Sequence, residues 1–422
     1  MAETDLRVVL EWDDGGGVRA KELQATWCRL EIAVGERLVT LLRDRRTGSF
    51  RQSIHVSAYP LAEWVAYHWW ALQAAVAKPG AASPGLSLRS VGDGFPWPRL
   101  SFAPDGDSTL LVWERSVDDR VAFVEDGSAR VDMQSFVRTA AAVVENTLSR
   151  LDDAGVPRTA LHDEWQAVHA LDDEERGFAL AAARLGIDPY DVSEPVAQAL
   201  VSASQELTPD LLDDVLTAAE PSGLRDLVTW VTGTVPGPGS TTAAAVGDLD
   251  RWRAGVTSSI RRAPGPAPWA RGFAAAQSVR PDLEPHPSSP VGLDDVVETL
   301  PRPFPHRSID AVGNEADVVR LVVPEGRSGR GLRFSQARAL YRALTTGRDR
   351  PFALTSARTG VQQAERAFAA ELLAPITGIR DRVPGPLTAV TDDDVDRLAD
   401  AFEVSALVIR HQIDNHAGRV AA

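Results

Sequence analysis

The sequence is almost free of cysteine and contains no long apolar run. Cys28 is the only cysteine among 422 residues, which excludes an internal disulfide, a cysteine-based zinc site and an iron–sulfur cluster. No uninterrupted apolar segment approaches the roughly 18–20 residues that span a bilayer. The first residues lack the basic start and the apolar stretch of a secretory signal. We therefore expect a cytoplasmic protein that has no membrane partner.

Lysine is also scarce, and the charged residues are unevenly distributed. Only Lys21 and Lys78 accompany 42 arginines, a bias that we attribute, together with the richness in alanine, to a high-GC coding sequence. The net charge is −15, and residues 151–250 alone hold 19 acidic and four basic side chains. Broad phosphate binding needs a concentrated basic face. The charge pattern therefore argues against a nucleic-acid partner.

Length and composition predict a globular protein with more than one domain. At roughly 150 residues per domain, the 422 residues correspond to two or three folded units. Apolar residues make up 44% and charged residues 24% of the chain, which is ordinary for a soluble globular protein.

The first segment, residues 1–155, is expected to be a β-rich domain. Apolar or alternating runs bounded by turn residues are typical of strands. Such runs occur at 6–12, 27–34, 38–42, 53–56, 109–113 and 121–124. The third and fourth runs flank a turn that contains Gly48, which predicts a hairpin between them.

A tryptophan-rich helix is expected within this domain. Apolar residues recur at helical spacing from 60 to 72, and Pro60 stands in the first turn. Trp64, Trp69 and Trp70 lie on this helix, and core packing is our interpretation of them; a recognition pocket or interface is the alternative, since aromatic residues are enriched there. A further helix, at about 132–151, closes the domain.

Three further segments follow. Residues 156–232 have helical periodicity with acidic residues on the solvated faces. Residues 233–250 combine glycine, proline and serine without periodicity and are predicted to be a linker. Residues 251–422 are predicted to be a mostly helical domain with a small sheet, which includes a strand at 316–323. The fold class expected for the whole chain is α+β.

Two motifs in the last domain carry a family resemblance. Residues 368–375 are Phe-Ala-Ala-Glu-Leu-Leu-Ala-Pro, and residues 398–405 have the pattern Leu-Ala-x-x-Phe-x-Val-Ser. In this order and spacing they resemble the ImmA/IrrE-type zinc metallopeptidases, and the resemblance extends from Trp269 to His416. It implies a zincin-like domain in a bacterial protein. It also implies an activity in which active relatives cleave a helix-turn-helix repressor and so relieve repression.

The resemblance also implies where zinc ligands would stand, and this sequence departs from the family at each position. Active members carry His-Glu-x-x-His on the helix that opens here at Arg333, and a glutamate on the next helix is the third ligand. The motif is replaced by Arg338-Ala339-Leu340-Tyr341-Arg342, and the third position falls at Gln362. Arginine has no lone pair for a metal, and alanine cannot move a proton. We expect no catalytic residue, no metal ligand and no zinc at this site.

The altered site has two interpretations. Arg338 and Arg342 share one helical face, and together with Arg333 they would offer forked donors to an anion or to a partner. Alternatively, they form internal salt bridges, for example with Glu365. Tyr341 would then fill the former cleft.

A relocated metal site is a further alternative. No pair of the eight histidines has His-x-x-x-His spacing, so a rebuilt site would need His306, Glu365 or Glu371 to converge through folding. The aspartates at 392–394 are better explained by a helix that Thr391 caps, because carboxylates are favourable at a helix N-terminus.

The end of the chain also has the spacing of a helix-turn-helix. Arg410, Gln412 and Asn415 lie along its second helix, and residues of these types read base edges. The acidic start of the preceding helix opposes DNA binding, because it would repel phosphate. The same pattern belongs to the C-terminal helices of the ImmA/IrrE-type family, where it packs on the core.

The sequence thus predicts a catalytically inactive ImmA/IrrE-like pseudo-metallopeptidase. We expect it to regulate or to sense through protein–protein contacts in stress response, mobile-element control or phage defence, with a repressor, a toxin or a defence component as its partner. Two alternatives remain. One is an active metallo-endopeptidase with a relocated metal site that cleaves a transcriptional repressor, and the other is a DNA-binding regulator that uses the C-terminal segment.

Overall fold

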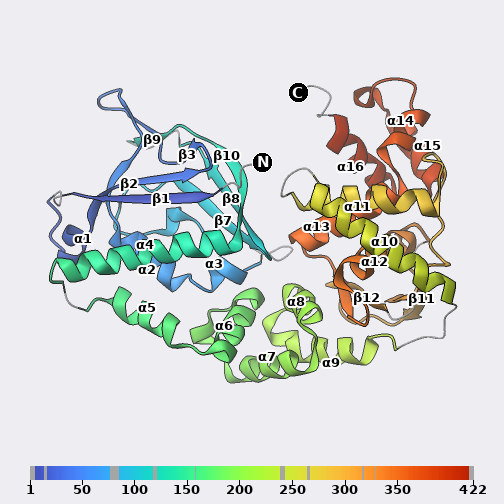
Figure 1. The fold of residues 1–422 in the computed structure, drawn as a ribbon, viewed down its shortest axis with the longest axis horizontal. Coiled ribbons are helices and arrows are strands. Elements are labelled where there is room, and N and C mark those ends of the chain that lie inside the picture. Colours follow the sequence, from blue (N-terminus) through green and yellow to red (C-terminus); the bar gives the residue numbers. More distant parts are fainter. Residues whose placement is uncertain are drawn as a thin grey trace. The chain divides into compact units, whose positions relative to one another are not determined.

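The computed structural model describes residues 5–13, 17–76, 85–116, 121–156, 158–237, 243–263, 267–315, 318–327 and 329–417. By its internal contacts the chain forms two units, unit 1 (Met1–Glu194) and unit 2 (Pro195–Ala422). Of the residues that the structure describes, 53% are helical and 19% lie in strands. The strands form several sheets in unit 1 and a single small sheet in unit 2 (Figure 1). The predicted α+β class is confirmed.

The described strands of unit 1 form three small antiparallel sheets. They are β1 (Leu6–Trp12), β2 (Trp27–Val34), β3 (Arg37–Leu38), β4 (Leu42–Asp44), β5 (Phe50–Arg51), β6 (Ile54–Ser57), β7 (Arg99–Asp105), β8 (Ser108–Glu114), β9 (Val121–Phe123) and β10 (Gly127–Asp132). The first sheet has the order β1-β2-β3, with β6 also paired to β2, and the others have the orders β10-β8-β7 and β5-β4-β9. The spans of β1 and β2 are those that the apolar pattern predicts.

The predicted hairpin between 38–42 and 53–56 is wrong. The turn lies between β4 and β5, which pair at Leu42 and Arg51, whereas β6 pairs with β2. The physical reason is burial. Ile54 and Val56 are buried in the core beside β2, while Phe50 at the hairpin is 65% exposed.

The described helices of unit 1 pack against the sheets or against one another. They are α1 (Lys21–Ala25), α2 (Tyr59–Tyr67), α3 (Ala71–Ala74), α4 (Met133–Asp153), α5 (Ala160–Ala170) and α6 (Asp173–Leu185), with short 3-10 turns at Leu88–Ser90 and Pro189–Asp191. The predicted helix at 60–72 is interrupted between α2 and α3. Trp64, Trp69 and Trp70 are all buried, and Trp69 packs edge-on against Trp165 with ring centroids 4.8 Å apart. These tryptophans are core residues.

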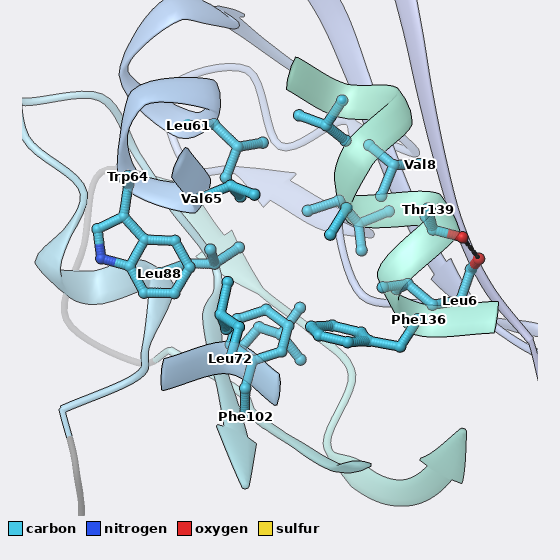
Figure 2. Close-up of a pocket in the computed structure, with 14 residues that line it drawn as sticks. Leu6, Val8, Leu61, Trp64, Val65, Leu72, Leu88, Phe102, Phe136 and Thr139 are labelled. Atoms are coloured by element: carbon cyan, nitrogen blue, oxygen red, sulfur yellow. Dashed lines mark hydrogen bonds between the residues drawn. The ribbon is translucent and has the colours of Figure 1, made fainter. Parts of the chain in front are cut away.

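The core of unit 1 contains a small apolar cavity (Figure 2). It measures about 40 Å³ and is lined by residues of β1, β2, α2, α3, α4 and β7, together with Leu88. Thr139 on α4 also lines it, and its hydroxyl donates to the Leu6 carbonyl at 3.2 Å. The atoms that line such a void lack van der Waals partners on one side. We interpret the cavity as a packing defect.

Filling this cavity is expected to stabilise unit 1. Val65 on α2 lines it, so Val65→Ile would add one methylene to the void and raise the free energy of unfolding by about 0.8 kcal/mol. The control is Val168→Ile on α5, which makes the same change at a buried position that does not line the cavity. That change should be neutral or destabilising, because the site is already filled. Calorimetry of both variants measures the difference, and equal effects would contradict the prediction.

Unit 2 combines helices with one mixed sheet. Its helices are α7 (Glu194–Glu206, which begins at the last residue of unit 1), α8 (Pro209–Ala218), α9 (Leu224–Thr234), α10 (Ala243–Arg262), α11 (Pro268–Leu283), α12 (Gly329–Thr346), α13 (Gly360–Leu373), α14 (Ile376–Arg382), α15 (Asp392–Phe402) and α16 (Ala406–Ala417), with 3-10 turns at Pro221–Gly223 and Leu387–Ala389. Its strands are β11 (Val297–Arg302), β12 (Ile309–Glu315), β13 (Val319–Pro324) and β14 (Phe352–Thr355). The sheet has the order β11-β13-β12-β14, and only the β11–β13 pair is parallel. None of the helices that the structure describes combines the length and apolar character needed to cross a membrane.

The two units do not follow the four predicted segments. Helix α8 packs against β14, because Leu211 and Val215 on its apolar face are buried; the second half of the predicted acidic segment therefore belongs to unit 2. The predicted linker at 233–250 overlaps the end of α9 and the first residues of α10, and residues 238–242 lie outside the described residues. The first two residues of the predicted strand at 316–323 also lie outside them.

Candidate functional site

The two helices that carry the altered motif positions, α12 and α13, pack against each other in the core of unit 2. Every residue of α12 from Ser335 to Leu344 is buried. A helix that is covered on all sides cannot leave its polar side chains to water, so the arginines within it need partners inside the protein. Arg338 and Arg342 are the charged residues of this stretch.

Arg338 is bound by two carboxylates and one carbonyl. Its Nε and Nη2 donate to Oε1 of Glu365 on α13 at 2.9 and 2.6 Å, and its Nη1 donates to Oδ2 of Asp310 on β12 at 2.7 Å. Nη2 also donates to the Thr355 carbonyl at the end of β14. The Arg338 side chain is 4% exposed and that of Glu365 is fully buried. The arginine thus joins α12 to α13 and to two strands of the sheet.

Arg342 forms a two-pronged ion pair with Asp214. Its Nη1 and Nη2 donate to Oδ1 and Oδ2 at 3.0 and 2.8 Å. Both side chains are almost fully buried. Asp214 also accepts a bond from the backbone N–H of Ala353, and the guanidinium lies over the ring of Phe352. The pair therefore ties α8 to α12 and β14.

These contacts keep both arginines charged. Burial by itself lowers the pKa of a guanidinium, because it penalises the charged form. The carboxylates outweigh this effect: Glu365 and Asp310 raise the pKa of Arg338, and Asp214 raises that of Arg342. The altered site therefore has a positively charged interior whose charge is neutralised from within.

The other predicted site residues are also engaged within unit 2. Ala339 is fully buried, and Gln362 is 2% exposed, with its Oε1 accepting a hydrogen bond from the Thr359 hydroxyl. Arg333 donates to the carbonyls of Phe402 and Glu403 at 3.1 and 3.0 Å and to the Glu403 carboxylate. It therefore caps the C-terminal end of α15. Arg338 and Arg342 are not open to a free anion or a partner, because their donors are committed inside the fold.

The predicted DNA-contacting residues do not form a common exposed face. Arg410 pairs with Asp392 at 2.9 Å on the surface, and Asn415 is exposed. Gln412 is buried, and its amide donates to Glu371 and to the Ala374 carbonyl at 2.8 and 3.0 Å. The assignment of Gln412 to base reading is therefore wrong, because its donors are used to hold α16 on α13.

The residues considered for a relocated metal site do not converge. Glu365 binds Arg338, Glu371 binds Gln412, and the ring of His306 lies 5.4 Å from that of Trp230. Within the ranges that the structure describes, no group of three histidine, cysteine, aspartate or glutamate side chains is placed to hold a metal ion. The relocated site has no candidate ligand set among these residues.

No model of a known protein family, no curated protein and no solved structure matches this chain. The resemblance to the ImmA/IrrE-type peptidases stays a prediction from the sequence motifs.

Sequence reasoning missed the two aspartates that complete the site. Asp214 has a signal that could have found it: it stands three residues after Leu211 and one before Val215, on the apolar face of a helix. A carboxylate at such a position needs a cationic partner inside the protein. Asp310 offers no comparable signal, since it is an ordinary polar residue of a strand.

Glu371 is a second buried carboxyl in this region. It is 2% exposed, and its Oε2 accepts bonds from Gln412 and from the backbone N–H of Ile376 at 2.8 and 3.2 Å. Burial raises the pKa of Glu371 to about 7, although these bonds and the nearby Arg280 oppose the shift. The carboxyl therefore changes its protonation near neutral pH.

This shift predicts how the stability of unit 2 depends on pH. Between the ordinary pKa of 4.5 and about 7, the folded chain keeps a proton that the unfolded chain has released. The free energy of unfolding therefore falls as pH rises through this window, by about 3 kcal/mol for this group. Glu371→Gln keeps the accepted bonds without the charge, so it should reduce the slope and stabilise unit 2 at pH values above the window.

Hydrogen exchange of α13 peptides across this pH range measures the effect. Asp381→Asn removes an exposed carboxylate of α14 and is the matched control. A slope that Glu371→Gln leaves unchanged would show that this carboxyl does not retain its proton in the fold.

Proposed function

We propose that unit 2 is a catalytically inactive, ImmA/IrrE-like pseudo-metallopeptidase that acts through contacts with a protein partner. The observation that carries this proposal is that both buried arginines of α12 are bound by carboxylates of the same unit. At the two positions where the family places imidazole ligands stand Arg338 and Arg342, and buried carboxylates bind both. A guanidinium offers a dication no lone pair, and the carboxylates beside both arginines are already bound to them.

The arrangement of α12 and α13 supports the proposal further. The resemblance places the third ligand on the helix after the motif helix, and α13 packs directly on α12. Gln362 stands at that position and accepts a bond from Thr359. The remaining general-base position is Ala339, which lies in a fully packed core. The residues at the two histidine positions thus form ion pairs, the residue at the general-base position packs in the core, and the residue at the third-ligand position forms a hydrogen bond.

A scaffold without its hydrolytic groups acts by binding. Following the resemblance, we propose a cytoplasmic role as a regulator or sensor in stress response, mobile-element control or phage defence. Its partner would be a repressor, a toxin or another defence component.

Zinc content and chelator-sensitive hydrolysis test the proposal together. The purified full chain, loaded with zinc and then desalted, is expected to contain far less than one zinc per chain by mass spectrometry of the metal. It should cleave neither casein nor a mixed peptide substrate in a way that phenanthroline inhibits. An active His-Glu-x-x-His peptidase treated in parallel is the positive control. Stoichiometric zinc together with chelator-sensitive cleavage would overturn the proposal.

A further inference from the structure

Strand β1 of unit 1 has a regular free edge. It pairs with β2 over all seven of its residues, without a bulge, and with no other strand among the described residues. It contains neither proline nor glycine. Proteins usually blunt such edges with proline, bulges or very short strands, because unpaired backbone groups recruit further strands. None of these three features is present on β1, although Arg7 and Glu11 are charged and α4 contacts the strand at Leu6.

The backbone bonds at both ends of β1 show which residues face this edge. The Asp5 carbonyl accepts from the N–H of Gly35, and the N–H of Asp13 donates to the Trp27 carbonyl. Hydrogen-bonded pairs alternate along an antiparallel ladder, so the odd-numbered residues of β1 face β2 and the even-numbered residues face away. Val8 and Leu10 therefore direct their N–H and C=O groups toward the free edge.

Helix α4 forms the opposite wall of a groove along this edge. Contacts link α4 to β1, and the Thr139 hydroxyl of α4 already donates to the outward-facing carbonyl of Leu6 (Figure 2). Beyond this bond the groove opens to about 280 Å³, and its lining includes Val8, Leu10, Ala142 and Asn146. The edge at Val8 and Leu10 is thus accessible from the groove, where a three-residue extended segment would complete four backbone hydrogen bonds.

The charge of the groove indicates the kind of segment that it fits. Its charged lining residues are Arg7 and Arg138, and no carboxylate lines it, although the whole chain carries a net charge of −15. Arg7 also pairs with Glu31 at the surface, whereas Arg138 is exposed and has no ion partner among the described residues. Acidic side chains on an added strand would meet this positive rim.

We propose that β1 binds an extended, acidic segment of a partner protein as an added strand, in the groove beside α4. Main-chain hydrogen bonds to Val8 and Leu10 supply the binding, and Arg138 supplies the preference for acidic side chains. This inference goes beyond the function proposed for unit 2, because every residue that it uses lies in unit 1.

Fluorescence anisotropy with a labelled probe peptide tests the proposal. The probe alternates glutamate with valine and threonine, and its control carries lysine in place of glutamate. The full chain should bind the acidic probe saturably and the lysine peptide at least about tenfold more weakly. Absence of binding at about 1 mM, or equal binding of both peptides, would overturn the proposal.

Val8→Pro separates strand addition from surface attraction. Proline removes an N–H that β2 does not use, and edge strands tolerate proline at such positions. We expect this variant to bind the acidic probe about fivefold more weakly, because one backbone hydrogen bond is lost. Val8→Ala keeps the N–H and should retain binding. Undiminished binding by Val8→Pro would exclude strand addition.

Two further measurements keep the test decisive. Arg138→Glu leaves the backbone unchanged and should also weaken binding of the acidic probe. The proposal can therefore be judged even if Val8→Pro does not fold, and unaltered binding would refute the assigned charge preference.

Sedimentation tests for self-association. If the chain dimerises and Val8→Pro abolishes the dimer, the occupant is a second copy of the chain and the partner-segment proposal is overturned.

Discussion

Arg342→Ala is expected to lower the free energy of unfolding of unit 2 by about 3–5 kcal/mol, because it leaves the carboxylate of Asp214 buried without its cation. Asp214→Ala should lower the free energy of unfolding by a similar amount, since it leaves the Arg342 guanidinium buried without its counterion. The double variant Arg342→Met with Asp214→Leu should recover most of the loss, because two apolar side chains need no partner. Denaturant-dependent hydrogen exchange of α12 and β14 peptides reports unit 2 separately from unit 1.

A second pair between neighbouring segments provides the control. Arg350 and Asp210 join the segment before β14 to α8 at 3.3 Å, but their side chains are 62% and 40% exposed. Arg350→Ala should therefore cost no more than about 1 kcal/mol. If Arg342→Ala costs as little as Arg350→Ala, the Asp214 pair is not desolvated, and the main observation behind the proposed function fails.

Gly272→Ala is expected to destabilise unit 2 by more than about 3 kcal/mol. Gly272 lies where α11 crosses α13, and an added Cβ would stand 2.0 Å from the Ala364 carbonyl oxygen and 2.9 Å from the backbone nitrogen of Phe368. These are backbone atoms, so the methyl group fits only if the two helices move apart. Separating them opens the buried interface, which lowers the free energy of unfolding by an amount typical of a disrupted core.

Gly255→Ala on the adjacent helix α10 is the matched control. An added Cβ there approaches nothing closer than the Ser278 hydroxyl at 4.0 Å. The substitution should raise helix stability by about 0.5–1 kcal/mol, since alanine loses less backbone freedom than glycine. Hydrogen exchange of α11 and α13 peptides measures both variants, and similar results for the two would argue against the close helix crossing.

The sequence was most informative where local chemistry decides the structure. β1 and β2 begin and end where their apolar patterns do. Thr391 caps α15 as expected, accepting from the Asp394 N–H while the Asp394 carboxylate accepts from the Thr391 N–H. In each case neighbouring residues supply the whole signal.

Long-range pairing could not be predicted in this way. The pairing of β6 with β2 depends on the burial of Ile54 and Val56 in the core. The local turn signal instead favours pairing with the segment at 38–42, which is nearer in the sequence. Likewise, Asp214 and Arg342 are 128 positions apart, so nothing in the motif itself indicates the partner. Of the salt bridges at this site, the sequence indicates only the one between Arg338 and Glu365. Both residues lie on predicted helices that follow each other in the chain, so this pairing could be considered.

The Asp214 contact also determines where the chain can be divided. A fragment that begins at residue 251, the predicted start of the last domain, would lack α8 and leave the Arg342 charge without its counterion. It would also begin inside α10 and lose the buried Leu249, so its failure to fold would say nothing about the rest of the unit. A fragment that begins at Pro195, the first residue of unit 2, retains the aspartate and is the one to express when the C-terminal half is studied alone.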